Sequence, residues 1–504
     1  MRVNTALGGN SMTSTIVRQN VPTFDHFVNG EWSPAGAGTH FDDYEPYTGE
    51  LYAMVADCDR DDARRAIAAA QNAFPAWSEL APMKKVDLFL KAADIVDARR
   101  AEFALTLAKE TGCTLFFANF QQDLVIQTLR QAANWVYQPK GDILQSDVPG
   151  TYSTAVRKPL GVVASFTPWN GANILSWRAV LAPIAAGNTV VVKPSELAPI
   201  SAGLMVAQVA IEAGFPPGVI NIVTHAPGKA APIADEFFEN PDVRCINFIG
   251  SVQTARMLAE RAGRVLKRSV MELGGYNPMI ILEDVDMDYA VRVAAFSAFF
   301  HQGQICMNAR KILVHRSIYD EFLAKLTAKT KELPQGDPEA PDTIVGPLIT
   351  RDAVKLVHAR VQDALEKGAT LVTGGTYEGQ VYAPTILTDV SDDAVASCEE
   401  TFGPVTIVQP VDSAEEALDI ANSSMYGLTS SILSGDTYRG FELAGKIKTG
   451  AVHVNIPTVD DEIQAPIGGV RDSGWGRTGP YCVDDFTDLI WINVQSGQRD
   501  LPIK

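Results

Sequence analysis

One cysteine stands where the sequence could build a nucleophile. Cys306 follows an aromatic stretch and a glycine turn, in the order FFHQGQIC over residues 299–306. A free thiol is largely protonated at neutral pH, so it needs a nearby positive field or a base that takes its proton. No histidine follows closely behind Cys306. Taken alone, such a cysteine is more often a small buried hydrophobe.

Two other segments offer partners for that thiol. In MELGG, residues 271–275, Glu272 stands at the end of an expected strand and could activate a thiol or a water. In PWN, residues 168–170, Asn170 offers an amide donor for an oxyanion. Each residue alone has an ordinary structural explanation, so their joint presence carries the hypothesis of nucleophilic catalysis.

Two strand ends could hold a phosphate or a ribose. The tetrapeptide Phe248–Ser251 ends an expected strand and opens a helix, whose free N–H groups favour an anion. In TVVVKPSE, residues 189–196, Lys193 and Glu196 follow a strand and could contact phosphate or ribose. A GxGxxG match at residues 474–479 has no strand before it, and we interpret it as structural loop glycines.

The elements that position these residues alternate between short apolar strands and helices. Strands are expected at 161–166, 189–192, 219–223, 245–249 and 278–282, and helices at 59–74, 83–111, 201–213 and 252–262. A second stretch of this kind runs from about 286 to 454. The alternation predicts two doubly wound α/β units, whose ligands bind at the carboxyl ends of strands. Residues 1–20 are polar and aperiodic, which predicts a loose tail.

Composition excludes several classes of protein. The 504 residues carry 42 Lys and Arg against 60 Asp and Glu, a net charge of −18. Such an acidic chain repels phosphate backbones, so nucleic-acid binding is not expected. No apolar run approaches the ~18 residues of a membrane helix, and the N-terminus shows no signal-peptide core. The six cysteines form no CxxC pair and the seven histidines no HExxH, so no metal is expected. A cytoplasmic setting follows as the expectation.

The whole set of motifs resembles the aldehyde dehydrogenase superfamily. Seven motifs occur in the family's order between about residues 25 and 495: PWN at 168–170, KPSE at 193–196, the tetrapeptide Phe248–Ser251, MELGG at 271–275, GQIC at 303–306, EETFGPV at 399–405 and PIGG…SGWGR at 466–477. The resemblance implies a Rossmann-like NAD-binding domain (21–144 and 160–272), a catalytic domain (273–470) and a small β oligomerisation arm (145–159 and 485–504). It also implies a homodimer or homotetramer, and the alternation FTDLIWINV, residues 486–494, is typical of a strand that needs a partner.

The resemblance further implies a hydrolytic, NAD(P)-dependent oxidation of an aldehyde to a carboxylate. Cys306 would form a thiohemiacetal and then a thioester, Asn170 would hold the oxyanion, and Glu272 would act as general base for the water. The implied cofactor-binding residues are Trp169, Lys193, Ser195, Glu196, Gly250, Ser251, Leu273, Gly274, Glu400 and Phe402. The carboxylate of Glu196 repels a 2′-phosphate, so we expect NAD over NADP, although some relatives with this acid accept NADP.

The substrate is expected to be an aromatic aldehyde. Residues 169–188 and 455–469 resemble the branch that acts on benzaldehyde, vanillin and salicylaldehyde. Flat rings need flat apolar walls, and the candidate pocket residues are Gly171, Trp177, Arg178, Phe116, Phe117, Phe300, His301 and Ile456. Gly171 would leave room beside the reactive carbon, and Arg178 or His301 could meet a polar ring substituent.

Three alternatives remain at this point: an aliphatic or terpenoid aldehyde dehydrogenase, a CoA-acylating relative, and a non-catalytic structural relative. Three departures from the family pattern also stand out. Tyr276 replaces the usual lysine after ELGG, Ala255 replaces a glycine on the helix that starts after Ser251, and THAPG, residues 224–228, replaces a glycine-rich turn.

Overall fold

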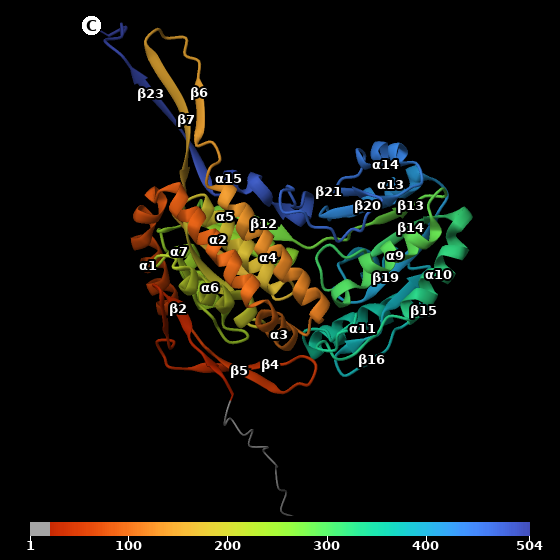
Figure 1. Ribbon diagram of the computed structural model, residues 1–504. Coiled ribbons are helices and arrows are strands. Elements are labelled where there is room, and N and C mark those ends of the chain that lie inside the picture. Colours follow the sequence, from red (N-terminus) through yellow and green to blue (C-terminus); the bar gives the residue numbers. More distant parts are fainter. Residues whose placement is uncertain (1–20, 504) are drawn as a thin grey trace, which may run out of the picture.

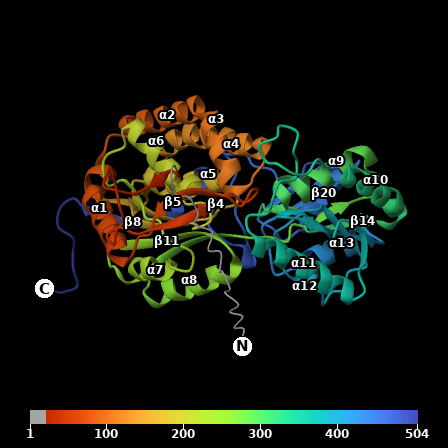
Figure 2. The same ribbon diagram turned by 90° about the horizontal axis from the view of Figure 1, so that it is seen from below.

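The computed structural model describes residues 21–503 as two α/β domains with a projecting arm (Figure 1). Each domain is built on one large sheet, and the two domains lie side by side (Figure 2). These features confirm the predicted fold class. The predicted N-terminal tail lies outside the described residues. A separate three-stranded sheet consists of β1 (Thr23–Phe24), β5 (Leu51–Ala56) and β4 (His40–Tyr44).

The first domain contains an eight-stranded sheet. In spatial order its strands are β22 (Gly474–Trp475), β12 (Arg268–Leu273), β11 (Val243–Gly250), β8 (Val162–Thr167), β9 (Thr189–Pro194), β10 (Ile220–Ile222), β2 (His26–Val28) and β3 (Glu31–Ser33). The five strands from β12 to β10 are parallel, and the outer three pair antiparallel. Parallel strands end at one common edge, which is where the predicted site residues follow.

Helices cover both faces of this sheet (Figure 2). One face packs against α2 (Pro82–Ala98), α4 (Leu115–Trp135), α5 (Ala172–Ala185) and α6 (Met205–Ala213), and the other against α1 (Arg60–Glu79), α7 (Ala230–Glu239) and α8 (Val252–Arg264). The side-chain period of two explains this double cover, because Val190 and Val192 of β9 join one core and Val191 the other. The helical stretch predicted at 83–111 is two helices, since α3 (Arg100–Thr111) starts anew after α2. A π-helical turn, η1 (Ile200–Leu204), leads into α6.

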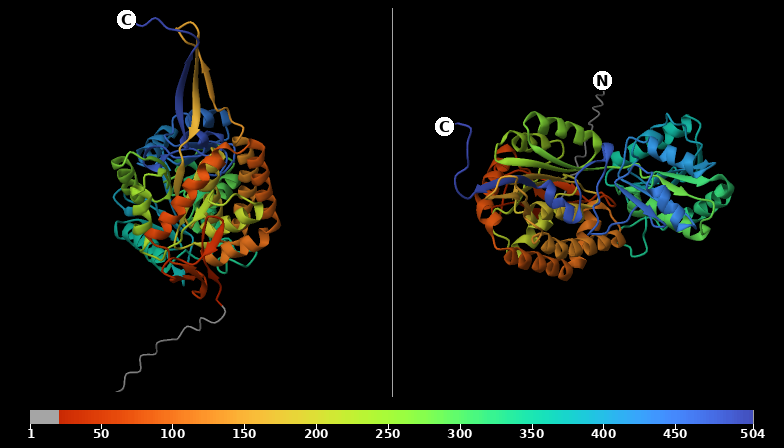
Figure 3. Two further views of the ribbon diagram at one scale, coloured as in Figure 1. Left: turned by 90° about the vertical axis from the view of Figure 1, so that its left-hand side faces the viewer. Right: turned by 90° about the horizontal axis from the view of Figure 1, so that it is seen from above.

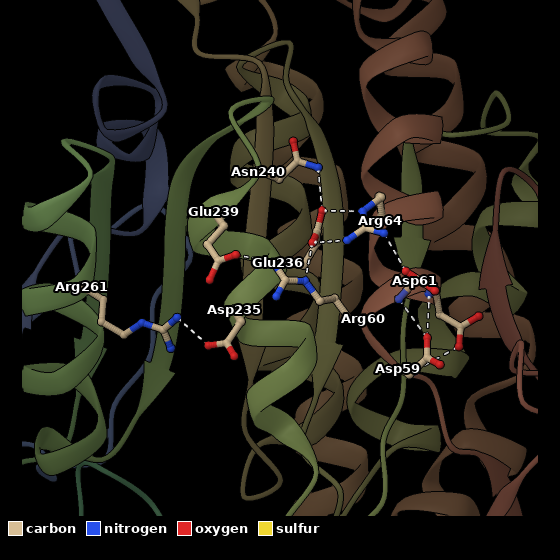
Figure 4. Close-up of polar contacts among 10 residues, drawn as sticks. Asp59, Arg60, Asp61, Arg64, Asp235, Glu236, Glu239, Asn240 and Arg261 are labelled. Atoms are coloured by element: carbon tan, nitrogen blue, oxygen red, sulfur yellow. Dashed lines mark hydrogen bonds and ion pairs between the residues drawn. The ribbon is translucent and has the colours of Figure 1, made fainter.

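Ion pairs join α1 to α7 (Figure 4). The carboxylate of Glu236 accepts hydrogen bonds from Arg60 Nε at 2.8 Å and from Arg64 Nη2 at 3.0 Å. Asn240 Nδ2 donates to the same carboxylate at 3.0 Å. Burial acts to raise the pKa of Glu236, but these hydrogen bonds outweigh burial and lower it. Asp59 caps α1 by accepting the N–H groups of residues 61 and 62.

The second domain contains a seven-stranded sheet with one antiparallel edge strand, β15. In spatial order the strands are β15 (Thr370–Thr373), β18 (Thr385–Thr388), β19 (Val405–Val411), β14 (Lys311–His315), β13 (Met279–Ile281), β20 (Thr429–Leu433) and β21 (Ala451–Val454). Its helices are α9 (Met287–Phe299), α10 (Tyr319–Lys331), α11 (Arg351–Glu366), α12 (Val395–Cys398), α13 (Ala414–Ser423) and α14 (Thr437–Ala444). A small hairpin, β16 (Tyr377–Glu378) and β17 (Val381–Tyr382), lies apart from the sheet.

The arm is a three-stranded antiparallel sheet that projects from the first domain (Figure 3). Its strands are β6 (Gly141–Leu144), β7 (Thr151–Pro159) and β23 (Thr487–Gln495), and β23 follows the short α15 (Cys482–Asp485). β23 pairs with β7 over its whole length, so the strand predicted near residues 486–494 does find its partner within the chain. β6 starts at residue 141, before the predicted start of the arm at 145. Across residues 21–503, no helix has the length and apolarity to span a bilayer.

Candidate active site

Cys306 lies in a loop between α9 and β14 whose backbone is held in place. After α9 ends at Phe299, His301 and Gln302 adopt left-handed φ angles of 52° and 53°, which turn the chain back on itself. Asn277 Nδ2 then donates to the backbone oxygen of Cys306 at 2.6 Å. Cys306 itself is half-buried. The loop therefore presents a reachable thiol on a fixed backbone.

Asn170 comes from the loop between β8 and α5 and reaches the same loop. Its side-chain Nδ2 donates to the backbone oxygen of Gln304 at 2.9 Å. An amide nitrogen has two N–H groups, so one of them remains for another acceptor beside Cys306. The side chain is almost fully buried, which restricts its orientation.

Glu272 is the next-to-last residue of β12, and it faces a cavity of about 310 Å³. The cavity collects many of the predicted residues: Trp169, Asn170, Arg178, Gly250, Ser251, Glu272, Leu273, Gly274, Cys306, Glu400 and Phe402. They come from the carboxyl ends of β11 and β12, from the segment after β8 with α5, and from the second domain, so the cavity lies between the two domains. A nucleophile, an amide donor and a carboxylate thus share one enclosed space.

Burial and neighbouring charges perturb these groups. Burial raises the pKa of Glu272 to about 6, while the nearby Arg178 acts to lower it. Burial, with the carboxylates of Glu400 and Glu272, raises the pKa of Cys306 to about 12. At neutral pH the thiol is therefore protonated and Glu272 is ionised. A base poised near neutrality beside a protonated thiol suits proton transfer during nucleophilic attack.

A second group of polar side chains lies at the ends of β9 and β10. Lys193 Nζ lies 2.7 Å from His225 Nε2 and donates to the backbone oxygen of Pro194 at 3.2 Å. Glu196 Oε2 lies 3.9 Å from His225 Nε2. Ser195 Oγ accepts the N–H of Leu197 at 3.2 Å. The strand therefore ends in a cation, an acid and a hydroxyl within one turn.

These residues fit a dinucleotide such as NAD. The buried ammonium of Lys193 shows two hydrogen-bond partners in the described chain, although an ammonium carries three donors. α8 begins at the cavity with Ser251 as its N-cap, and a helix N-terminus offers N–H groups to a phosphate. At the cavity's other side, Glu400 accepts the N–H of Gly275 at 3.3 Å, and burial raises the pKa of Glu400 to about 7.

The comparison with protein families decides the identity. The model of the aldehyde dehydrogenase family matches residues 32–492. The chain belongs to the aldehyde dehydrogenase family. The vanillin dehydrogenase of Pseudomonas fluorescens is 42% identical over 477 residues, which cover 94% of this chain and 98% of the relative. The benzaldehyde dehydrogenase YfmT of Bacillus subtilis is 37% identical over 94% of this chain and 98% of its own.

A solved structure shows the same relationship. The salicylaldehyde dehydrogenase from Pseudomonas putida G7, complexed with salicylaldehyde, superposes with a TM-score of 0.94 at 36% identity. The superposition covers 96% of this chain and 100% of that chain. The resemblance seen in the sequence is thereby confirmed, and the chain is an aldehyde dehydrogenase.

The aromatic residues predicted for the pocket of this dehydrogenase do not line the 310 Å³ cavity. Trp177 does not line this cavity, because its side chain is fully buried in the core of the first domain. Neighbouring residues on a helix point about 100° apart, so Arg178 reaches the cavity and Trp177 turns away from it. Phe116 is mostly exposed and Ile456 is at the surface with 37% exposure.

Phe117, Phe300 and His301 form one packed cluster instead. The Phe117 ring stacks on His301 at 4.1 Å and meets Phe300 edge-on at 5.2 Å. Burial lowers the pKa of His301 to about 3, so its ring is neutral. The cluster belongs to the apolar core that also contacts Cys306, so it backs the thiol without lining the cavity. Gly171 is the N-cap of α5, and a Cβ there would lie 3.1 Å from the side chain of Leu175.

Sequence reasoning missed several cavity residues. They are apolar: Leu175, Ile249, Met307, Leu428 and Ile467. Leu175 had a signal, because it stands four residues after Gly171 and three before Arg178 on one helix face. Arg178 itself is paired, since its Nη2 donates to Asp461 Oδ2 at 2.6 Å. Ile467 lies within the PIGG motif, whereas Leu428 had no local signal, because the fold alone brings it to the site.

The departures from the family pattern have structural counterparts. The hydroxyl of Tyr276 donates to the backbone oxygen of Ala396 at 3.1 Å, and Lys311 Nζ lies 5.7 Å from the centroid of its ring. Ala255 is buried on α8 against the sheet. Neither residue lines the cavity.

Proposed function

We propose that this enzyme oxidises aromatic aldehydes to carboxylic acids, with NAD as the hydride acceptor. The substrate class rests on one observation about the relatives. Proteins named vanillin, salicylaldehyde and benzaldehyde dehydrogenase are 42%, 36% and 37% identical to this chain, each over 94% of its length. The apolar residues that line the cavity beside Cys306, such as Leu175, Met307 and Leu428, support that class, since flat rings bind between apolar walls.

The reaction begins with Cys306 in this proposal. Its Sγ bonds to the carbonyl carbon of the aldehyde, and the thiol proton moves to Glu272 as the bond forms. Glu272 suits this step because its pKa of about 6 leaves it ionised at neutral pH. The product of the step is a thiohemiacetal, whose oxygen carries the developing negative charge.

Asn170 and the backbone N–H of Cys306 hold that oxygen. One Nδ2–H of Asn170 donates to Gln304 O, which leaves the second Nδ2–H for the oxygen of the thiohemiacetal. Such a preorganised donor contributes about 10²- to 10³-fold in rate. Lys193 and Glu400 would hold NAD, which would supply the acceptor for the hydride that leaves the carbon. A thioester on Cys306 remains.

Glu272 completes the turnover. Once it has released the thiol proton to solvent, it takes a proton from a water that attacks the thioester carbon, the carbon–sulfur bond breaks, and the leaving thiolate receives that proton from Glu272. Arg178 lies near enough to act on the pKa of Glu272. The carboxylic acid then leaves through the cavity.

The arm supports a homodimer or homotetramer. β23 is an edge strand of the arm, and its apolar side chains are exposed, with Leu489 at 62%, Trp491 at 69% and Val494 at 56%. An exposed apolar edge strand is a template for pairing with another chain. The proposed setting is the cytoplasm, where six free cysteines stay reduced.

The test is NADH formation at 340 nm with benzaldehyde, vanillin, 4-hydroxybenzaldehyde, salicylaldehyde and hexanal, each with NAD and NADP. Turnover of the aromatic aldehydes with NAD is the expected result. Turnover of hexanal alone would refute the aromatic substrate class while leaving the family assignment intact. A preference for NADP would refute the cofactor assignment.

A further inference from the structure

The turn after β10 carries a histidine, His225, whose side chain contacts Lys193 at the end of β9. β9 and β10 are parallel neighbours, with Val192 opposite Ile222, so the residues that follow each strand meet. Lys193 lies near the end of β9, and His225 lies in the turn that follows β10. The imidazole of His225 is fully buried. Nothing in the proposed chemistry uses this residue so far.

The contacts of His225 permit one protonation state. Nδ1 lies 2.9 Å from the backbone oxygen of Ala226, which can only accept, so Nδ1 carries the proton. Nε2 lies 2.7 Å from Lys193 Nζ, and an ammonium can only donate, so Nε2 accepts. The ring is therefore the neutral Nδ1–H tautomer. Burial and the charge of Lys193 lower the pKa of His225 to about 4, in agreement with this state.

The turn that carries the imidazole is held to the end of β5. The N–H of Ala226 donates to Asp57 Oδ1 at 2.9 Å. Thr224 donates through Oγ1 to the backbone oxygen of Ala56 at 2.6 Å, and the N–H of Cys58 donates to the backbone oxygen of Thr224 at 3.0 Å. These hydrogen bonds hold the turn and its imidazole ring in place, so the ring cannot move with a displaced Lys193 side chain.

The hydrogen bond to this fixed ring helps to set the orientation of the Lys193 ammonium. One N–H is taken by His225 and one by the oxygen of Pro194, and the centroid of the Phe166 ring lies 5.7 Å away. In residues 21–503 the structure shows no third acceptor. Two fixed bonds on a tetrahedral nitrogen determine where the third N–H points. Glu196, a third exposed, stands beside it as an acceptor.

We propose that His225 is a positioning residue for the adenosine ribose of NAD: it orients Lys193 so that one N–H is presented to a ribose hydroxyl beside Glu196. The inference rests on the proposed function and deepens it. A ribose diol needs one donor and one acceptor, and Lys193 and Glu196 supply that pair. The lone pair of Nε2 accepts a hydrogen bond from the Lys193 ammonium, so His225 has no free N–H to donate to a 2′-phosphate. This favours NAD over NADP.

Two substitutions separate the hydrogen bond from the space that the ring fills. His225→Phe keeps an aromatic ring and removes both hydrogen bonds, whereas His225→Asn keeps an acceptor and a donor on a smaller side chain. NAD binding is measured by titration calorimetry on the enzyme without aldehyde. We expect the Kd for NAD to rise about 10-fold in His225→Phe and less than about 3-fold in His225→Asn.

The pH profile gives a second readout. Burial lowers the pKa of Lys193 to about 8, and the nearby Glu196 acts to raise it. Loss of the acceptor at Nε2 disfavours the ammonium further, so NAD affinity should fall off at a lower pH in His225→Phe than in the wild type. The other charges facing this pair are Asp57, which lies against the His225 turn, and Lys229, which pairs with Asp57.

The matched control is His358→Phe, because His358 is a partly buried histidine bonded to Tyr382 in the second domain. Its NAD affinity should equal that of the wild type. If His225→Phe lowers the Tm, His225→Leu takes its place, since leucine is smaller than phenylalanine. Equal NAD affinity in wild type and the Phe or Leu variant, at pH 7 and at pH 8.5, would overturn the proposal. So would equal losses in the Asn and Phe variants. Wild-type turnover of the aldehyde panel tests the proposed function separately.

Discussion

Replacing Arg178 with leucine should move the acidic limb of the pH–rate profile toward higher pH. Arg178 and Asp461 form a buried pair, with side chains 11% and 6% exposed and Nη2 2.6 Å from Oδ2. Arg178 lowers the pKa of Glu272, while Asp461 raises it. The substitution removes the positive charge of Arg178, which lowers the pKa of Glu272, and leaves the negative charge of Asp461, which raises it. The pKa of Glu272 therefore increases from about 6.

The magnitude follows from the charges involved. An opposite charge within about 4–6 Å lowers the pKa of a carboxyl group by about 1–3 units, so its loss should raise the pKa of Glu272 by about one unit or more. Glu272 must be ionised to act as a base, and activity is lost as the pH falls through its pKa. The limb should therefore shift by the same amount, with about 10-fold less activity at a pH well below both values.

The assay is the steady-state rate with saturating NAD and benzaldehyde between pH 5 and 9. Leaving Asp461 unpaired costs roughly 3–5 kcal/mol of stability, so the melting temperature is measured alongside. The double variant Arg178→Leu/Asp461→Leu removes both charges and should shift the limb less than the single variant does. Arg264→Leu, on the exposed surface of α8, is the control and should leave the limb in place. An unchanged limb in Arg178→Leu, or a shift to lower pH, would refute the reasoning.

Four other substitutions test separate parts of the structure. Cys306→Ala should abolish turnover while calorimetry still detects NAD binding; substantial residual turnover contradicts its role. Glu272→Gln should slow hydrolysis of the thioester, so stopped-flow absorbance at 340 nm should show a burst of NADH before a slow steady state. Normal steady-state turnover in that variant would remove Glu272 as the base. Asn170→Ala should lower kcat about 10²- to 10³-fold, and a loss under about threefold contradicts the oxyanion role. Glu236→Gln should lower the stability measured in urea by about 1 kcal/mol or less at low salt, and less at high salt, because its partners Arg60 and Arg64 are exposed; an effect that does not depend on salt contradicts the ion-pair explanation.

The catalytic cavity was predictable because its residues stand where strands end. Glu272 is the next-to-last residue of β12, Asn170 follows β8, and Cys306 follows a helix and a glycine turn. Parallel strands bring their carboxyl ends together whatever the rest of the chain does. The order of strands in the sheet therefore had little influence on the prediction.

The residues of the substrate pocket and the contact between His225 and Lys193 were harder to predict, for two physical reasons. Trp177 and Arg178 are adjacent in sequence but diverge on a helix, so composition alone could not tell which one faces the cavity. The contact of His225 with Lys193 depends on β9 and β10 being neighbours, a pairing that no local pattern records. The glycines at 474, 476 and 479 all have positive φ angles, and a Cβ on Gly474 would lie 2.2 Å from the backbone oxygen of Met271. They are structural, as the sequence indicated.

The pairing of β22 with β12 has a consequence for biosynthesis. Gly474 lies opposite Glu272, so the strand that carries the carboxylate is bordered by a segment about 200 residues further along the chain. On the ribosome, β12 emerges about 200 residues before this neighbour and remains an open edge until β22 has been made. A prematurely terminated chain would expose that edge to other nascent chains, and it would lack a complete site. Synthesis of β22 is therefore needed before the strand that carries Glu272 has both of its neighbours.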